Sequence, residues 1–471
     1  MEFFLSVFFL LFYYLRPQDW VPGLTGANLI KPIIAIWLLT LLVNRSRPAA
    51  LNGLLRTPHD WAMLAYFAYI VITAPDFMAA FTGFLPFVAF YALTVQSVNT
   101  WPRLLSYLKW WNMALVFVAL LAVMSLFGLD LTGAKEPTAR FADRLSLGTW
   151  LHDNPNALGH SVITVIPLAY FLFFWKGSAA GRFVVFPLLA ALAYYCVLRT
   201  ESKGSFLVGG ILVAAVFVVG RPRIVQILAT VTALTLGIGA LSFLPRMADM
   251  NNLRADEGVQ GRLLAWEQAR NVTRKTETGE GWQQFIALID WKEGNRMIYD
   301  IPKSTHSSYV QVGADLGQYG LFLYLAALWC ALHTLLVFKP TSEMEDRCRR
   351  VLLVLLIGNV ISGWMINRQY HTEYFLIIAA TASLHRLRKA AEIAEEEAKS
   401  LLEDESEEGD EVKEQEEKPP SATAVPAFAR ETSPLDTIKP LWNRFGMVDL
   451  VVSIGLTWLT FWTWDYILEN I

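Results

Sequence analysis

The chain has 471 residues, of which 54% are hydrophobic and 17% are charged, and its formal net charge is −3. Long apolar runs recur through it, which excludes an ordinary soluble protein and predicts an all-α polytopic integral membrane protein, because lipid offers the backbone no hydrogen-bond partners. The charge balance gives no reason to expect a nucleic-acid partner. Three scattered cysteines suggest neither a disulfide framework nor a zinc site.

The apolar runs predict about twelve transmembrane helices, since a helix needs roughly 20 apolar residues to cross a bilayer. They lie near residues 2–16, 29–44, 59–75, 79–97, 104–127, 158–175, 182–199, 205–220, 224–244, 308–338, 350–367 and 373–387. The first run carries Glu2 and no basic residues, so we expect a membrane helix there rather than a secretory signal.

Basic residues fall in alternate short loops, which predicts the orientation, because Lys and Arg are concentrated on the cytoplasmic side. With a cytoplasmic N-terminus, six loops agree, and they contain Arg45, Arg47, Arg56, Arg103, Lys176, Arg182, Arg221, Arg223, Lys339, Arg347, Arg349, Arg350, Arg386, Arg388 and Lys389. One large loop, about residues 245–307, then lies outside the cytoplasm.

The C-terminal part divides into two further regions after a membrane domain at 1–387. Residues 388–445 are charged and then rich in Pro, Ser, Thr and Ala, which predicts a largely disordered cytoplasmic tail that can begin as a solvated helix. Residues 446–471 form a hydrophobic helix that either spans the membrane or lies in its interface. Its aromatic residues, including Trp464, have the distribution of an interfacial belt.

The first polar cluster on the outer side precedes the sixth predicted helix. Asn154-Pro-Asn156 is turn chemistry, and its amides, with Arg144 and Arg140, are candidates to contact sugar hydroxyls or phosphate. Weaker candidates on the same side are Arg16, Asp19, Trp20, Arg368 and His371.

A second cluster, Arg199 to Ser205, joins the seventh and eighth predicted helices. Lys203 is a mobile point charge suited to phosphate, and Gly204 allows close backbone approach. The alternative for Lys203 is a snorkelling lysine that marks a helix end.

The large outer loop carries the strongest candidates. Arg262 and Trp266 lie one helical turn apart on one face, and arginine can fork two hydrogen bonds onto a phosphate. His306 follows Lys303 at the mouth of a membrane helix, and histidine is the natural proton acceptor near neutral pH. Taken separately, each has a plainer explanation: a solvated arginine, an interfacial tryptophan, a surface histidine.

In this order, the clusters resemble the O-antigen ligase superfamily, which includes O-antigen polymerases and protein O-oligosaccharyltransferases. The matching motifs are Asn154-Pro-Asn156, Thr200-Glu-Ser-Lys203-Gly204, Arg262-x-x-x-Trp266, Gly279-x-Gly281, and His306-Ser-Ser-Tyr309 followed by Leu316-Gly-Gln-Tyr-Gly320-Leu321. One departure is Lys203, where the family commonly has arginine; lysine keeps the charge but loses the bidentate fork.

The resemblance implies a C-type glycosyltransferase-like fold and metal-independent, inverting glycosyl transfer without a cofactor. The donor would be an undecaprenyl-pyrophosphate-linked glycan and the acceptor a lipid A-core, a glycan or a protein, at the bacterial inner membrane. His306 would be the base, and Arg262 and Lys203 would hold the leaving pyrophosphate, whose growing charge fixed cations stabilise. Arg199, Arg144, Asn154, Asn156, Trp266 and Lys303 would complete the substrate site.

Two other classes remain open from the sequence. A small-anion or bicarbonate transporter would place ionisable residues near the bilayer midplane, whereas in this chain they gather at the outer surface. A structural scaffold would not need histidine, arginine and lysine on one face. The placement of these charges favours the enzyme.

Overall fold

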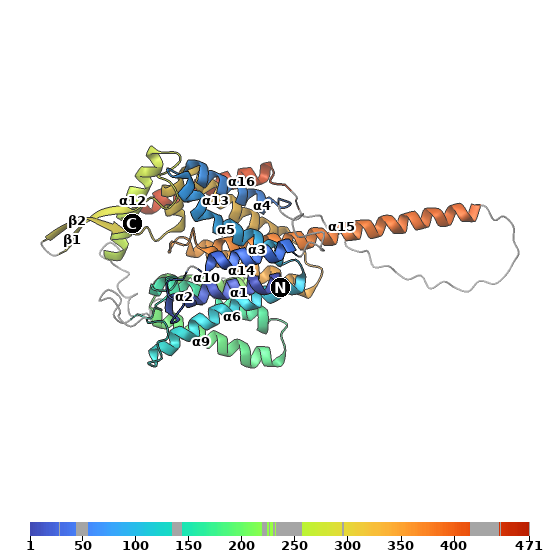
Figure 1. Ribbon diagram of the computed structural model, residues 1–471, viewed down its shortest axis with the longest axis horizontal. Coiled ribbons are helices and arrows are strands. Elements are labelled where there is room, and N and C mark those ends of the chain that lie inside the picture. The colour runs from blue at the N-terminus through green and yellow to red at the C-terminus, as the bar shows by residue number, and fades with distance from the viewer. Residues whose placement is uncertain are drawn as a thin grey trace.

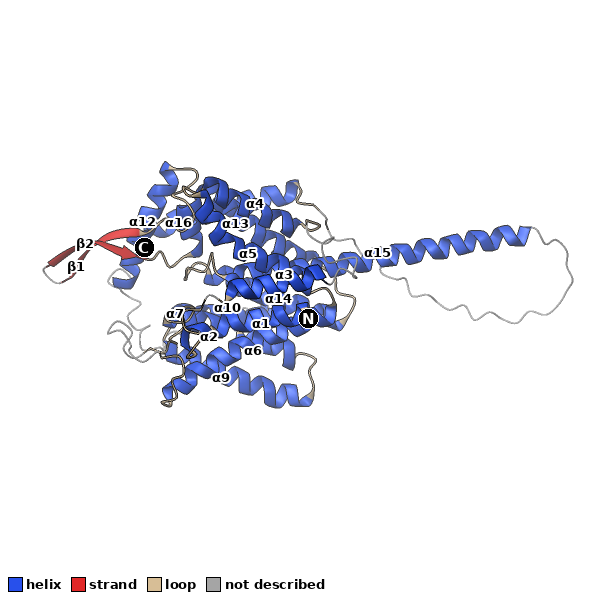
Figure 2. Ribbon diagram, viewed as in Figure 1, coloured by secondary structure: helices blue, strands red, loops and turns tan. Residues whose placement is uncertain are grey.

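The computed structural model describes residues 1–27, 29–43, 55–133, 144–218, 224–225, 227–228, 231, 257–293, 296–414, 442 and 444–470. Most described helices gather in one body, as Figure 1 shows, with a β-hairpin at one end and the far part of the longest helix projecting from the other. Figure 2 shows that this hairpin is the β structure among the described residues.

Along the chain, two groups of helices are separated by the hairpin. The elements are α1 (Glu2–Leu15), α2 (Pro17–Trp20), α3 (Ile30–Val43), α4 (Pro58–Thr73), α5 (Phe77–Ser97), α6 (Trp101–Leu126), α7 (Pro155–Val162), α8 (Val165–Ala169), the π-helical turns η1 (Tyr170–Phe174) and η2 (Gly181–Val185), α9 (Phe186–Thr200), α10 (Lys203–Val218), α12 (Glu257–Lys275), β1 (Ala287–Glu293), β2 (Arg296–Lys303), α13 (Ser308–Val337), α14 (Glu343–Ser362), α15 (Thr372–Glu414) and α16 (Met447–Asn470).

The predicted membrane segments coincide with helices, apart from 224–244, most of which lies outside the described residues. Six helical stretches are long and apolar enough to cross a membrane: Phe77–Ser97, Trp101–Leu126, Pro155–Phe174, Gly181–Thr200, Ser308–Val337 and Met447–Asn470. Three shorter apolar helices lie at Glu2–Leu15, Ile30–Val43 and Lys203–Val216. The chain is therefore a mostly helical membrane protein, and the number of twelve or thirteen spans stays a prediction.

The predicted outer loop has structure of its own. Its described part contains α12 and the antiparallel pair β1–β2, which the apolar pattern did not predict. The tail region likewise begins as helix, because α15 continues unbroken from the membrane domain to Glu414, while most of 415–443 lies outside the described residues.

A break in α13 fixes the outer loop to the membrane domain. Gly317 has φ +65°, a left-handed conformation that glycine adopts without steric cost, and the helix breaks there. The carbonyls of 314–316 are bound instead by the backbone N–H groups of Glu280 and Gly281 and by the hydroxyl of Tyr69, at 3.1, 2.7 and 2.9 Å. The Gly279-x-Gly281 motif is thus a docking turn for the broken helix.

Helix α16 lies antiparallel along α13. Near its start, Asp449 accepts from Trp329 and lies 2.8 Å from the imidazole of His333. Near its end, Trp464 packs against Gly313, close to the start of α13. Because α13 is long enough to cross the membrane, this alignment favours a spanning α16 over an interfacial one.

Candidate functional site

Trp266 on α12 positions the segment that leads to His306. Its side chain is 7% exposed, and its Nε1–H donates to the carbonyl of Thr305 at 2.6 Å. The indole is therefore held inside the protein rather than at a membrane surface. Arg262, one turn earlier on α12, is brought to the same part of the molecule.

His306 stands immediately before α13 in a constrained backbone. Its φ is +48°, in a region that costs a residue with a side chain roughly 1–2 kcal/mol. The next residue, Ser307, caps the helix by accepting from Val310 N, and its hydroxyl also donates to Gly363 O at 3.3 Å. Ser308 donates to Ile366 O at 2.8 Å. The loop after α14 therefore holds the His306 backbone in place.

Lys303 lies against α12, beside Arg262. A Cβ placed on Gly261 would lie 2.6 Å from Lys303 Cε and 2.9 Å from its Nζ, so the lysine chain occupies the space that this glycine leaves. Lys303, of the predicted set, thus lies against α12 at the residue that precedes Arg262 in the chain.

The Lys203–Gly204 junction meets this neighbourhood through His160. A Cβ on Gly204 would lie 3.0 Å from His160 Nε2 and 3.1 Å from Met365 Sδ. The charge of Arg262 acts on the same imidazole. His160 therefore packs against the start of α10, and it was not among the residues predicted from the sequence.

His160 could have been noticed only indirectly. It closes α7, the helix that Asn154 caps, and its Nδ1 lies 3.0 Å from Ser362 Oγ at the end of α14. Its neighbours are thus far away in the chain, and the local sequence indicates only a turn followed by a helix.

Other predicted binding residues have structural partners in the protein. Arg144 donates from Nε to Thr200 O at 2.9 Å and from Nη2 to Asn156 Oδ1 at 2.8 Å. Asn154 accepts from the backbone of Asn156 at 2.8 Å and so caps α7. These side chains join α7 to the α9–α10 junction. Arg199, at the end of α9, is exposed, and its carbonyl accepts from Leu145 N at 2.9 Å.

Arg368 belongs to a buried ion pair. Its guanidinium is bound to Glu373 at 2.7 Å and to Ser161 Oγ at 2.6 Å, and the residue is 6% exposed. It joins α7 to the start of α15. Its charge also acts on two histidines outside the membrane helices. The burial of each imidazole is the main cause and the positive charge of Arg368 the second. Together they lower the pKa of His371 to about 3 and that of His152 well below its usual value.

These two histidines are therefore weak proton acceptors, because a base whose pKa lies far below the working pH accepts a proton poorly. Among the described residues, no group of three or more His, Cys, Asp or Glu side chains is placed to hold a metal ion.

Helix α16 packs against α12 and holds it in position. Trp464, expected in an interfacial belt, is instead fully buried and donates from Nε1 to Trp266 O at 3.2 Å. Asp465 accepts two hydrogen bonds from Arg270, at 2.6 and 2.7 Å, and a third from Arg274 at 3.2 Å. The belt interpretation fits Trp458, Trp462 and Tyr466, which are exposed.

Comparison with known proteins gives a family match, and it covers this region. No curated protein matches the chain. The family model described as O-antigen ligase matches residues 188–325, which include Lys203, Arg262 and His306. The resemblance to the O-antigen ligase superfamily is therefore confirmed over this part of the chain.

Proposed function

We propose that the protein is a glycosyltransferase that moves a glycan, with inversion, from an undecaprenyl-pyrophosphate carrier to an acceptor hydroxyl, with lipid A-core as the favoured acceptor. The reaction takes place on the extracytoplasmic face of a bacterial inner membrane. The observation that carries the proposal is that Trp266 of α12 binds the carbonyl of Thr305, next to His306, on the helix that carries Arg262, while the Lys203–Gly204 junction packs against His160 of α7.

The orientation of the site is supported by the arrangement of the charged loops. Arg347 donates to the carbonyl of Lys176, so two of the basic loops predicted to be cytoplasmic lie together. The hairpin that precedes His306 lies at the end of the molecule opposite the projecting part of α15 (Figure 1). The basic loops and the tail on one side, and the site on the other, agree with the positive-inside rule.

The chemistry assigns one role to each group. His306 takes the proton of the acceptor hydroxyl, whose oxygen attacks the anomeric carbon from the side opposite the leaving group. The bond from that carbon to the pyrophosphate oxygen breaks, and its electron pair leaves with the pyrophosphate. Arg262 and Lys203 stabilise the charge that develops there, and no metal is required.

The test is transfer by purified protein in detergent, from undecaprenyl-pyrophosphate-linked glycan to lipid A-core. We expect His306→Ala to lose about 10²–10⁴-fold in rate, Arg262→Ala to be comparably severe, and Lys203→Arg to be tolerated. Lys275→Ala, which removes an exposed cation at the end of α12, is the matched control. Wild-type turnover by His306→Ala would overturn the mechanism.

Further assays distinguish a lipid A-core ligase from a polymerase and a protein O-oligosaccharyltransferase, and test whether a metal is needed. Chain growth without added acceptor would indicate a polymerase, and transfer only to a protein would indicate an O-oligosaccharyltransferase. Activity that survives a chelator supports the metal-independent reaction, and activity lost with the chelator and restored by a divalent ion contradicts it.

A further inference from the structure

A cavity of about 390 Å³ lies beside the His306 segment, and its lining includes none of the three residues to which the mechanism assigns a role, His306, Arg262 and Lys203. Its walls come from the loop before α7, the turn before β1, the end of β2, the start of α13 and the loop between α14 and α15. Its volume is near the lower end of the roughly 300–1,000 Å³ typical of small-molecule sites. This is room for a mono- or disaccharide.

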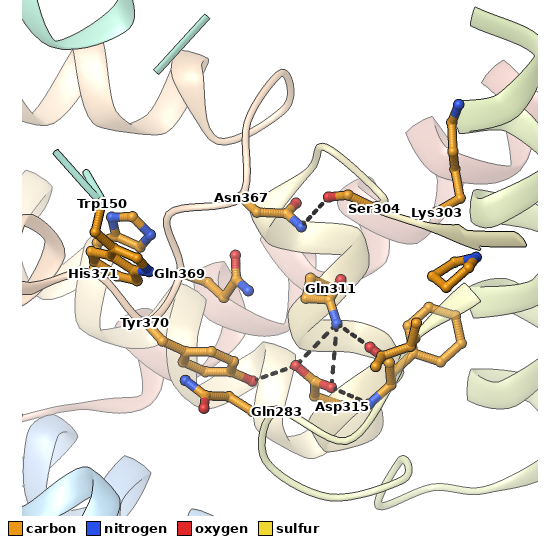
Figure 3. A pocket seen from close by; sticks show the side chains of 13 residues that line it. Trp150, Gln283, Lys303, Ser304, Gln311, Asp315, Asn367, Gln369, Tyr370 and His371 are labelled. Atoms are coloured by element: carbon orange, nitrogen blue, oxygen red, sulfur yellow. Dashed lines mark hydrogen bonds between the residues drawn. The ribbon is translucent and has the colours of Figure 1, made fainter. Parts of the chain in front are cut away.

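The cavity contains a buried polar group without a protein partner. Gln369 is 7% exposed, and its Oε1 has no hydrogen-bond partner among the described residues. Figure 3 shows its carboxamide directed into the space beside Asn367 and Gln311. An unpaired buried acceptor costs about 1–3 kcal/mol, so a ligand that donates a hydrogen bond is favoured there.

A second unpaired polar atom lies on the same wall. His371 Nδ1 also lacks a partner among the described residues. Its ring stacks on that of Trp150 with centroids 5.2 Å apart, and the guanidinium of Arg16 lies 4.9 Å from the Trp150 ring. This wall is therefore an aromatic pair fixed in place, and it contains a buried imidazole nitrogen that has no partner among the described residues.

The floor of the cavity is rigid because it is built around a buried carboxylate. Asp315 is fully buried and accepts from Phe285 N at 2.9 Å and from Tyr370 Oη at 3.0 Å. Gln311 Nε2 lies 3.3 and 3.4 Å from the two Asp315 oxygens and donates to Phe285 O at 2.9 Å. Figure 3 shows this network below Asn367 and Ser304.

The lining favours a neutral ligand with many hydroxyl groups. The polar groups are mainly amides, with two hydroxyls and an imidazole; the Asp315 carboxyl is already paired with Phe285 N and Tyr370, and the one lysine on the rim, Lys303, directs its chain to Gly261. Groups that both donate and accept suit sugar hydroxyls, whereas a pyrophosphate would require cations.

The cavity lies on the side of the His306 segment that faces away from α12. The carbonyl of Thr305 is bound by Trp266 of α12, while its hydroxyl lies 3.0 Å from both Gln311 Oε1 and Asn367 Oδ1, which line the cavity. The segment therefore separates α12, with the cation Arg262, from the cavity.

We propose that this cavity binds a sugar residue of the acceptor glycan and presents its hydroxyl to the His306 segment. That this glycan is the acceptor rests on the proposed transferase function, but the binding of a neutral sugar can be tested without turnover. Gln369 is then a specificity-determining residue, which contacts the substrate but takes no part in proton transfer.

The experiment measures binding in the His306→Ala background, by saturation-transfer NMR and calorimetry on protein in nanodiscs. The probe is deacylated lipid A-core oligosaccharide, with methyl glucoside and methyl galactoside as single-ring probes. We expect Gln369→Ala to weaken binding about 2- to 12-fold, the value of one neutral hydrogen bond, and the space-filling Gln369→Phe to abolish it. Gln284→Ala, an exposed glutamine outside the cavity, is the matched control.

Kinetics of the enzyme with His306 intact distinguish the two possible sources of the sugar. The proposal predicts a raised KM for the acceptor in Gln369→Ala, with the donor KM and the kcat unchanged. A raised donor KM alone would assign the cavity to the donor glycan and overturn the acceptor proposal. Thermal unfolding checks that both variants are folded.

The two proposals can fail separately. Oligosaccharide binding that depends on Gln369 in a protein without transfer activity would support the sugar site and contradict the transferase. Transfer with normal acceptor KM in a folded Gln369→Phe variant would support the transferase and contradict the sugar site. Binding that is the same in wild type and Gln369→Phe would also overturn the sugar site.

Discussion

Replacing Trp266 by phenylalanine tests whether α12 positions His306. Phenylalanine keeps most of the buried ring but removes the N–H that donates to Thr305 O at 2.6 Å. A buried carbonyl left without its donor costs about 1–3 kcal/mol. In the docked form, the segment of Thr305 and His306 is bound to α12 through this hydrogen bond. If the docked form loses this free energy, its population relative to the form without the bond falls about 5- to 150-fold.

The measurement combines steady-state transfer with hydrogen exchange of the segment that contains Thr305 and His306. We expect a lower kcat, an unchanged donor KM, and faster exchange of the backbone amides from 304 to 307. Trp462→Phe, an exposed tryptophan on α16, is the control and should change neither. Normal kcat together with normal exchange in Trp266→Phe would refute the reasoning.

Three further predictions concern the support of the site. Asp465→Asn should loosen α16 from α12, because the forked ion pair with Arg270 is lost; a double-mutant cycle on unfolding temperature should show coupling between them, and no coupling would contradict it. Gly317→Ala should prevent stable folding, because φ is +65° and the Cβ would overlap the carbonyl oxygen of Glu277, whereas Gly455→Ala, with open space around it, should be neutral in thermal unfolding. The pKa of His371, lowered from 6.5 to about 3, predicts a contribution to stability that is full above about pH 6.5 and falls by about 1.4 kcal/mol per pH unit as the pH drops towards 3. His371→Gln should flatten this dependence in unfolding measured across that range, and an unchanged slope would contradict it.

Apolar length was a sufficient guide to the membrane helices, because each such segment must satisfy its own backbone hydrogen bonds in lipid. The hairpin was not predictable in the same way. Its strands, Ala287–Glu293 and Arg296–Lys303, mix charged and apolar residues without a clean alternation. Part of their support comes from outside the strands: Gln268 on α12 accepts from Leu288 N at 2.9 Å.

In the site, too, some features follow from the local sequence, and others depend on contacts between residues that are distant in the chain. The Arg262–Trp266 pair follows from helical spacing, so the sequence alone predicts that they share a face. The place of His160 depends on Gly204 and Ser362, which are distant in the chain, and no local pattern reports such contacts. For the same reason, the burial of Trp464 was missed: an aromatic residue near a helix end fits an interfacial belt equally well.

The support that α16 gives to α12 has a consequence for biosynthesis. Trp464 and Asp465 are translated long after Trp266 and Arg270, with the whole of α13 to α15 and the tail between them. A nascent chain that has already inserted its earlier helices therefore lacks the packing behind its α12. Competence for transfer should then appear only when α16 enters the membrane, so that partly made chains compete poorly for the carrier lipid.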